Sequence, residues 1–125
     1  MIGEIEDPVD IGDTTPETPC DKSLPEAKTL GGMKYAVVRA YPEGMFAGYI
    51  ESRKGREVVL RKSRRLYLTW GALTPSELAV YGPTEPQKCK YCVEVERTEL
   101  LHAFEILYTT EIARKVITNV PDWVI

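Results

Sequence analysis

Hydrophobic and polar positions alternate in short runs over the middle of the chain, which is the pattern of β-strands. Residues 33–41 (MKYAVVRAY) and 45–52 (MFAGYIES) are rich in β-branched and aromatic side chains, and a Pro-Glu-Gly turn separates them. Residues 57–62 and 64–70 have the same character and follow a turn at Gly55, where a tight hairpin needs a positive φ angle. This pattern predicts a run of short antiparallel strands.

Alternation within residues 64–70 assigns their side chains to the two faces of a strand. We expect the apolar face to lie in the core, and it comprises Leu66, Leu68 and Trp70. We expect the other face to lie in solvent, and it comprises Arg65, Tyr67 and Thr69. Half of this strand is therefore predicted to be core, and half is exposed.

A short helix is predicted after these strands. Thr74 is placed to cap a helix that begins at Pro75, and Glu77 completes a capping box with Thr74. The helix runs to about Tyr81, because Gly82 and the proline after it stop it.

A second helix is predicted to begin after Thr109 or Thr110 and to run to about Thr118. We expect its inward face to hold Ile112, Val116 and Val120. Residues 99–108 fit both a helix and a strand, and we choose a turn of helix followed by a strand. The predicted fold class is therefore α+β, with a small twisted antiparallel sheet of four to six strands and two short helices.

Residues 1–32 differ from the rest of the chain in composition and charge. They contain eight acidic and two basic residues, for a net charge of −6, with four prolines and no aromatic residue. Such a segment cannot bury enough apolar surface to offset the entropy of ordering it. We therefore predict an acidic N-terminal arm that is disordered in isolation, followed by a single domain over residues 33–125 with a net charge of +3.

The composition of the 125-residue chain is that of an ordinary globular protein, with 43% hydrophobic and 28% charged residues. No apolar run is long enough to span a membrane, and the acidic first residues differ from a secretory signal. Three cysteines are too few for a disulfide framework, which fits a reducing compartment. We expect a cytoplasmic protein with no membrane contact.

Positive charge is concentrated in residues 53–65, which hold seven basic residues and one acidic residue. Arginine offers a planar fork of donors to anionic oxygens, and an exposed aromatic ring can stack on a base. We therefore predict a site for an anionic small molecule or nucleic acid, formed by Arg39, Arg61, Arg64, Arg65 and Tyr67. The alternative is that exposed strand cations only prevent edge-to-edge aggregation. Arg53 and Arg56 favour an anion site, because stability alone would prefer opposite charges at a hairpin tip.

Other chemistry has weaker support in the sequence. Cys89 and Cys92 have the spacing of half a zinc site, and Cys20 with His102 would complete four ligands. The sequence has no second paired-ligand motif and no glycine-rich phosphate loop. His102 is the only histidine, so it has no histidine partner for acid-base work. We therefore predict no metal site, no cofactor and no catalytic residues, and so a protein that is not an enzyme.

A series of motifs extends over residues 33–123: MKYAVVRAY, FAGYIESRKGREVVL, RRLYLTWGA with LTPSELAVYG, PQKCK, FEIL and VPDW. In this order they resemble a family of small uncharacterised proteins of bacteriophages and prophages, a domain of unknown function. The resemblance implies a phage-encoded accessory protein in the host cytoplasm, and it brings no catalytic residues with it. The acidic arm lies outside the resemblance.

The leading hypothesis is a non-enzymatic accessory protein that binds an anionic ligand, either a nucleotide signal or nucleic acid, and interferes with a host process. By analogy this process is an antiviral defence. Pairing of two copies would cover the edges of a small sheet, so we expect a homo-oligomer. The alternative is a protein-interaction or virion component whose acidic arm, residues 1–32, orders on a host protein.

Overall fold

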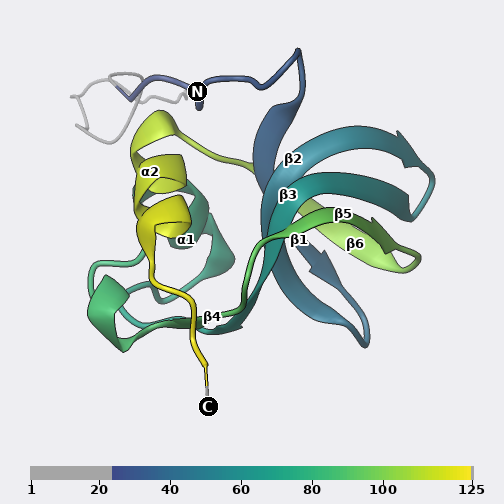
Figure 1. Ribbon diagram of the computed structural model, residues 1–125. Coiled ribbons are helices and arrows are strands. Elements are labelled where there is room, and N and C mark those ends of the chain that lie inside the picture. Colours follow the sequence, from purple (N-terminus) through teal and green to yellow (C-terminus); the bar gives the residue numbers. More distant parts are fainter. Residues whose placement is uncertain (1–23, 125) are drawn as a thin grey trace, which may run out of the picture.

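The computed structural model describes residues 24–124 and has the predicted α+β architecture (Figure 1). Its elements are, in chain order, β1 (Lys34–Ala40), β2 (Gly44–Lys54), β3 (Glu57–Leu68), α1 (Pro75–Tyr81), the 3-10 turn η1 (Pro86–Lys88), β4 (Lys90–Tyr91), β5 (Val95–Leu100), β6 (Ala103–Tyr108) and α2 (Glu111–Asn119). Neither α-helix within this range is long and apolar enough to cross a membrane.

The six strands form one antiparallel sheet in the order β4-β3-β2-β1-β6, with β5 also paired to β3. β3 is long enough to pair with β5 along its first half and with β4 near its end. Only Leu101 and His102 separate β5 from β6, although these strands lie at opposite sides of the sheet. The sheet is therefore strongly curled, and the backbone N–H of Ala103 donates to the carbonyl of Arg56 at 3.0 Å.

Two clusters of apolar side chains hold the sheet in place. β1 lies between β2 and β6, and its residues 35–38 are all buried because successive side chains enter different clusters. The cluster under the helices includes Tyr35, Val37, Leu66, Leu78, Tyr91 and Ile117. The cluster inside the curl includes Ala36, Val38, Phe46, Val58, Leu60 and Leu100. Figure 1 shows α1 and α2 together on one side of the sheet.

Both helices begin where the sequence predicts. The Oγ1 of Thr74 accepts a hydrogen bond from the backbone N–H of Glu77 at 3.1 Å, which is the first half of the capping box. The Oγ1 of Thr110 likewise accepts from the N–H of Ala113 at 3.1 Å. The two helices are then joined directly, because the N–H of Thr110 donates to the carbonyl of Ala79 at 3.0 Å.

Pairing between distant segments overrides two local predictions. The predicted turn of helix before β6 is wrong, because residues 95–100 form β5 and pair with β3 through Val58↔Leu100 and Val59↔Glu99. Residues 57–62 and 64–70 do not form separate strands either. Residues 57–68 form one strand, β3, with a single left-handed residue at Lys62 (φ 50°).

Three of the predicted core positions, Leu68, Trp70 and Ile112, are wrong. β3 ends at Leu68, which is 38% exposed, so its alternation does not reach Trp70, which is 47% exposed. The buried apolar positions of α2 are Ala113 and Ile117, one turn apart, whereas Ile112 is exposed and Val116 is half-buried. The hydrogen bond from Thr110 to α1 joins the start of α2 to that helix, and the small Ala113 is fully buried one turn further on.

Residues 24–30 of the predicted arm pack against the domain. The N–H of Ala27 donates to the carbonyl of Thr109 at 3.1 Å, and the N–H of Lys28 donates to the Glu111 carboxylate at 2.7 Å. The carbonyl of Pro25 accepts from the N–H of Glu111 at 3.0 Å. This short segment therefore belongs to the packed body, and the remainder of the predicted arm lies outside the described residues.

Candidate functional site

Two of the five predicted site residues are paired with carboxylates of the protein itself. Arg39 on β1 lies 2.7 Å from Glu105 on β6, and its guanidinium sits over the ring of Phe104. Arg61 on β3 lies between Glu96 at 2.9 Å and Glu51 at 3.2 Å. The hydrogen bond from Arg61 lowers the pKa of the Glu96 carboxyl, as expected for a carboxylate that accepts from a cation.

Arg64 is the third predicted residue, and its side chain is buried, with 5% exposure. Its Nε donates to the carbonyl of Cys92 at 3.0 Å, and its Nη1 donates to the carbonyls of Ile117 at 3.0 Å and Val120 at 2.7 Å. Its Nη2 donates to the carbonyl of Tyr91 and to the Asp122 carboxylate at 3.1 Å.

Every N–H of the Arg64 guanidinium therefore has an acceptor inside the protein. Two of these acceptors are carbonyls at the C-terminal end of α2, where a cation is electrostatically favoured and unpaired carbonyls need donors. Arg64 thus ties β3 to β4, to the end of α2 and to the C-terminal segment.

Arg65 and Tyr67, the remaining two predicted residues, share the exposed face of β3 as predicted. The guanidinium of Arg65 lies 4.8 Å from the ring centroid of Phe46. The side chain of Tyr67 is 64% exposed, and its ring stacks on Trp123 with centroids 5.4 Å apart and an interplanar angle of 2°. An exposed, parallel aromatic pair therefore lies beside a cation.

The position of Trp123 depends on Arg64. The N–H of Trp123 donates to the carbonyl of Tyr91 at 2.8 Å. Asp122 forms an isolated β-bridge with Tyr91, and its carboxylate forms an ion pair with Arg64. Arg64 holds the C-terminal segment against β4, and in this position the Trp123 ring stacks on Tyr67. Arg64 and its neighbour Arg65 thus have different roles at the same end of the sheet.

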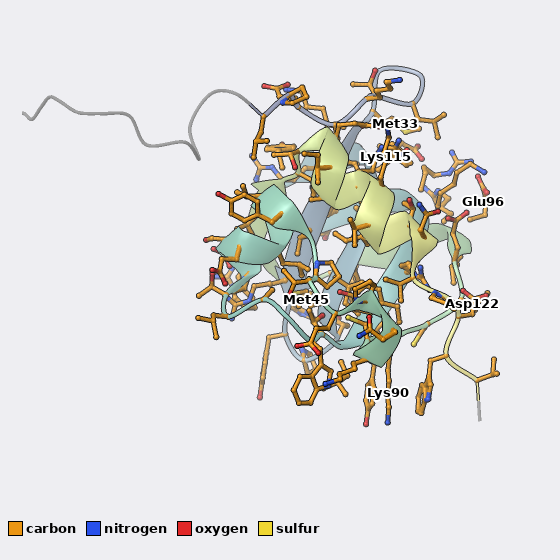
Figure 2. The ribbon with its side chains drawn as sticks, turned by 90° about the vertical axis from the view of Figure 1, so that its left-hand side faces the viewer. Met33, Met45, Lys90, Glu96, Lys115 and Asp122 are labelled. Atoms are coloured by element: carbon orange, nitrogen blue, oxygen red, sulfur yellow. The ribbon has the colours of Figure 1, made fainter. Side chains whose placement is uncertain are left out.

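Two lysines around η1 and β4 extend this surface. The Nζ of Lys90 lies 5.0 Å from the ring centroid of Trp123, and the Nζ of Lys88 lies 5.3 Å from that of Trp70. Figure 2 shows Lys90 at the lower end of the molecule, far from Lys115 on α2. We call this surface the aromatic platform, and it consists of Arg65, Tyr67, Trp70, Lys88, Lys90 and Trp123.

Sequence reasoning missed four members of the platform. The alternation in residues 64–70 predicts Trp70 in the core, and neither this alternation nor the basic run of residues 53–65 includes Lys88, Lys90 or Trp123. A signal for Trp123 was present, because the tryptophan follows a proline and an aspartate just beyond a predicted helix. An aromatic residue that follows the end of a helix does not belong to the apolar face of that helix. Its ring is therefore a candidate for the protein surface.

Two of the candidate metal ligands, Cys89 and His102, are engaged in other contacts, and Cys92 is a free, half-buried thiol. The Cys89 thiol is buried, accepts from the N–H of Trp70 at 3.3 Å and lies within donating distance of its carbonyl at 3.7 Å. The Nδ1 of His102 lies 3.6 Å from the Glu43 carboxylate. Within residues 24–124 no group of three or more histidine, cysteine or acidic side chains converges, and Cys20 lies outside this range.

Comparison with protein-family models found a match over residues 33–117, to a model described as a domain of unknown function. This match begins at the residue where the sequence places the start of the domain. Searches of curated proteins and of solved structures returned no match.

Proposed function

The chain belongs to DUF6948, a domain family of unknown function, and we propose that it is a non-enzymatic binding protein that captures single-stranded nucleic acid on the aromatic platform. One observation carries the proposal, namely the parallel, solvent-exposed pair of Tyr67 and Trp123 with Lys90 over the tryptophan ring. Proteins that bind single strands combine aromatic rings that stack bases with cations that follow the phosphates.

The placement of the cations favours a polymer over a single small anion. Lys88 and Lys90 flank Cys89, and each lies over a different exposed tryptophan, so two cation–ring pairs come from neighbouring positions in the chain. Arg65 adds a third positive charge on the same strand as Tyr67. A strand of nucleic acid meets such a repeated arrangement with successive bases and phosphates, whereas one nucleotide uses only part of it.

We further propose that the protein is a phage-encoded or prophage-encoded accessory protein that acts in the host cytoplasm. The support is the resemblance to small phage proteins of the motifs in residues 33–123, taken in their order along the chain. On this proposal, capture of nucleic acid interferes with a host process, with antiviral defence as the analogy. Self-association is part of the proposal, because β5 and β6 each have a partner strand on one side only among the described strands. Native mass spectrometry of the full chain checks the subunit number.

The proposal is tested by fluorescence anisotropy of a labelled oligothymidylate with the full chain. Tyr67→Ala and Trp123→Ala each remove one stacking ring, worth about 1–3 kcal/mol per base, so each should weaken binding roughly 5- to 150-fold. Tyr81→Ala is the matched control, because it removes an exposed tyrosine from α1, an element that contributes no residue to the platform. Circular dichroism verifies that each variant is folded.

Three outcomes would contradict the proposal. The wild-type chain shows no saturable binding at low salt, or Tyr81→Ala weakens binding as much as Tyr67→Ala. The third outcome favours the alternative function instead: deletion of residues 1–23 abolishes capture of a host protein, while the platform variants behave as wild type.

A further inference from the structure

A cavity of about 340 Å³ lies away from the aromatic platform, between the β2–β3 hairpin and β6. The hairpin contributes Arg53, Gly55, Arg56 and Val58, and β6 contributes residues 103–106. The curl of the sheet creates this cavity, because the hydrogen bond from Ala103 to Arg56 brings the start of β6 to the hairpin. Figure 1 shows the tip of the β2–β3 hairpin and the turn between β5 and β6 on the same side of the molecule.

The lining of the cavity has an excess of positive charge. Its one carboxylate, Glu105, is paired with Arg39 at 2.7 Å and therefore does not neutralise the other lining residues. No carboxylate within residues 24–124 forms an ion pair with Arg53 or Arg56. Arg53 donates from Nη1 to the carbonyl of Gly55 at 3.0 Å, which holds its guanidinium near the hairpin tip.

The strand register leaves the two arginines of this hairpin without an opposing carboxylate. Lys54 lies opposite Glu57 and Arg53 lies opposite Val58, so the carboxylate at the hairpin tip faces the lysine and not an arginine. A bound anion could therefore pair with Arg53 and Arg56. Arginine suits a phosphate in particular, because its planar fork donates to two oxygens at once.

The cavity also has an aromatic wall. Phe104 lines it, is 54% exposed, and has the Arg39 guanidinium 4.9 Å from its ring centroid. A phenylalanine ring beside two arginines offers stacking to a planar group next to a phosphate site. The volume lies at the lower end of the range for small-molecule sites, which is roughly 300–1,000 Å³.

We propose that this cavity binds a small phosphorylated molecule with a planar ring, of the mononucleotide class. Arg53 and Arg56 hold the phosphate, and Phe104 packs against the ring. The cavity shares no residue with the aromatic platform, so this inference does not rest on the nucleic-acid proposal.

The test is calorimetric titration of the full chain with two probes, adenosine monophosphate and inorganic phosphate. The double variant Arg53→Ala with Arg56→Ala should weaken binding of both probes at least about tenfold, because charged hydrogen bonds are lost. Phe104→Leu should weaken the nucleotide and leave inorganic phosphate unchanged. The matched control, Lys28→Ala with Lys115→Ala, removes the same charge from exposed lysines outside both the cavity lining and the β2–β3 hairpin, and it should change neither affinity more than about twofold.

The inference is overturned if adenosine monophosphate gives no saturable binding, or if the lysine double variant loses as much affinity as the arginine double variant. It is also overturned if Tyr67→Ala abolishes nucleotide binding, because the nucleotide would then occupy the aromatic platform. If Phe104→Leu lowers the affinity for adenosine monophosphate and for inorganic phosphate equally, Phe104 does not contact a planar ring, and the proposed mononucleotide class is wrong.

Discussion

Arg64 and Arg65 are adjacent in the chain, yet one guanidinium is enclosed by backbone carbonyls and the other lies in solvent over the ring of Phe46. Successive residues of a strand point to opposite faces, and here one face is covered by α2 and the C-terminal segment. The same residue type therefore has a structural role at one position and a candidate binding role at the next.

Replacement of Arg64 should strongly destabilise the protein. Arg64→Ala leaves several buried carbonyls and the Asp122 carboxylate without a donor, so we expect the free energy of unfolding to fall by about 3–5 kcal/mol in urea titrations. Arg64→Lys should rescue little, because an ammonium cannot reproduce the planar fork. Arg65→Ala is the control and should cost no more than about 1 kcal/mol. Similar losses for the two alanine variants would refute the anchoring role of Arg64.

The contact between α2 and residues 25–28 should depend on pH through Glu111. Hydrogen bonds from Arg114 and then from the N–H of Lys28 lower the pKa of the Glu111 carboxyl from the ordinary 4.5 to about 2. Because the folded-state pKa is depressed, the stabilisation is fully present above about pH 4.5 and is lost as the pH falls toward 2. Urea unfolding across this window should show a smaller pH dependence in Glu111→Gln than in wild type. An unchanged slope would contradict this assignment.

Gly48 should not tolerate a side chain. A Cβ atom at this position would lie 2.5 Å from Cβ and 2.8 Å from Cα of Ser63 on the neighbouring strand. The backbone of β3 must move to accommodate it, so we expect Gly48→Ala to cost about 1–3 kcal/mol of stability, measured by thermal unfolding. Ser52→Ala, at an exposed position of the same strand, is the control and should stay within about 0.5 kcal/mol. A neutral Gly48→Ala would show that β2 and β3 are further apart.

Binding of nucleic acid should weaken with salt in proportion to the cations on the platform. Each phosphate contact to a single strand contributes a slope of roughly −0.7 in a plot of log K against log salt concentration. Lys90→Ala should therefore make the slope shallower by about 0.7, as measured by anisotropy at several salt concentrations. Lys115→Ala removes a lysine from the other end of the molecule and should leave the slope unchanged. Identical slopes for the two variants would place the phosphates elsewhere.

Arg39 should affect nucleotide binding through Glu105. Arg39→Ala leaves the Glu105 carboxylate unpaired at the cavity, so it should weaken binding of adenosine monophosphate severalfold in calorimetry. The double variant Arg39→Ala with Glu105→Gln removes both charges and should restore most of the affinity. If Arg39→Ala weakens nucleotide binding and the double variant binds no more tightly, Arg39 does not act through the charge of Glu105.

Local chemistry was sufficient to predict several elements of this fold. The strands around Val37 and Phe46, the hairpin at Gly55 and the caps at Thr74 and Thr110 follow from side-chain alternation, turn residues and hydrogen bonding within a few residues. The exposure of Arg65 and Tyr67 follows from the same alternation. These features depend on neighbours in sequence, so the sequence by itself determines them.

Contacts between distant segments decided the rest. Residues 99–100 are strand because β3 offers free backbone groups there, and Trp70 is exposed because β3 ends two residues earlier. Arg64 is buried because α2 and the C-terminal segment, more than fifty residues away in the chain, bring their carbonyls to it. The meeting of Tyr67 with Trp123 has the same origin. A backbone group takes whichever partner the folded chain brings to it, and this choice depends on tertiary packing, which no local pattern encodes.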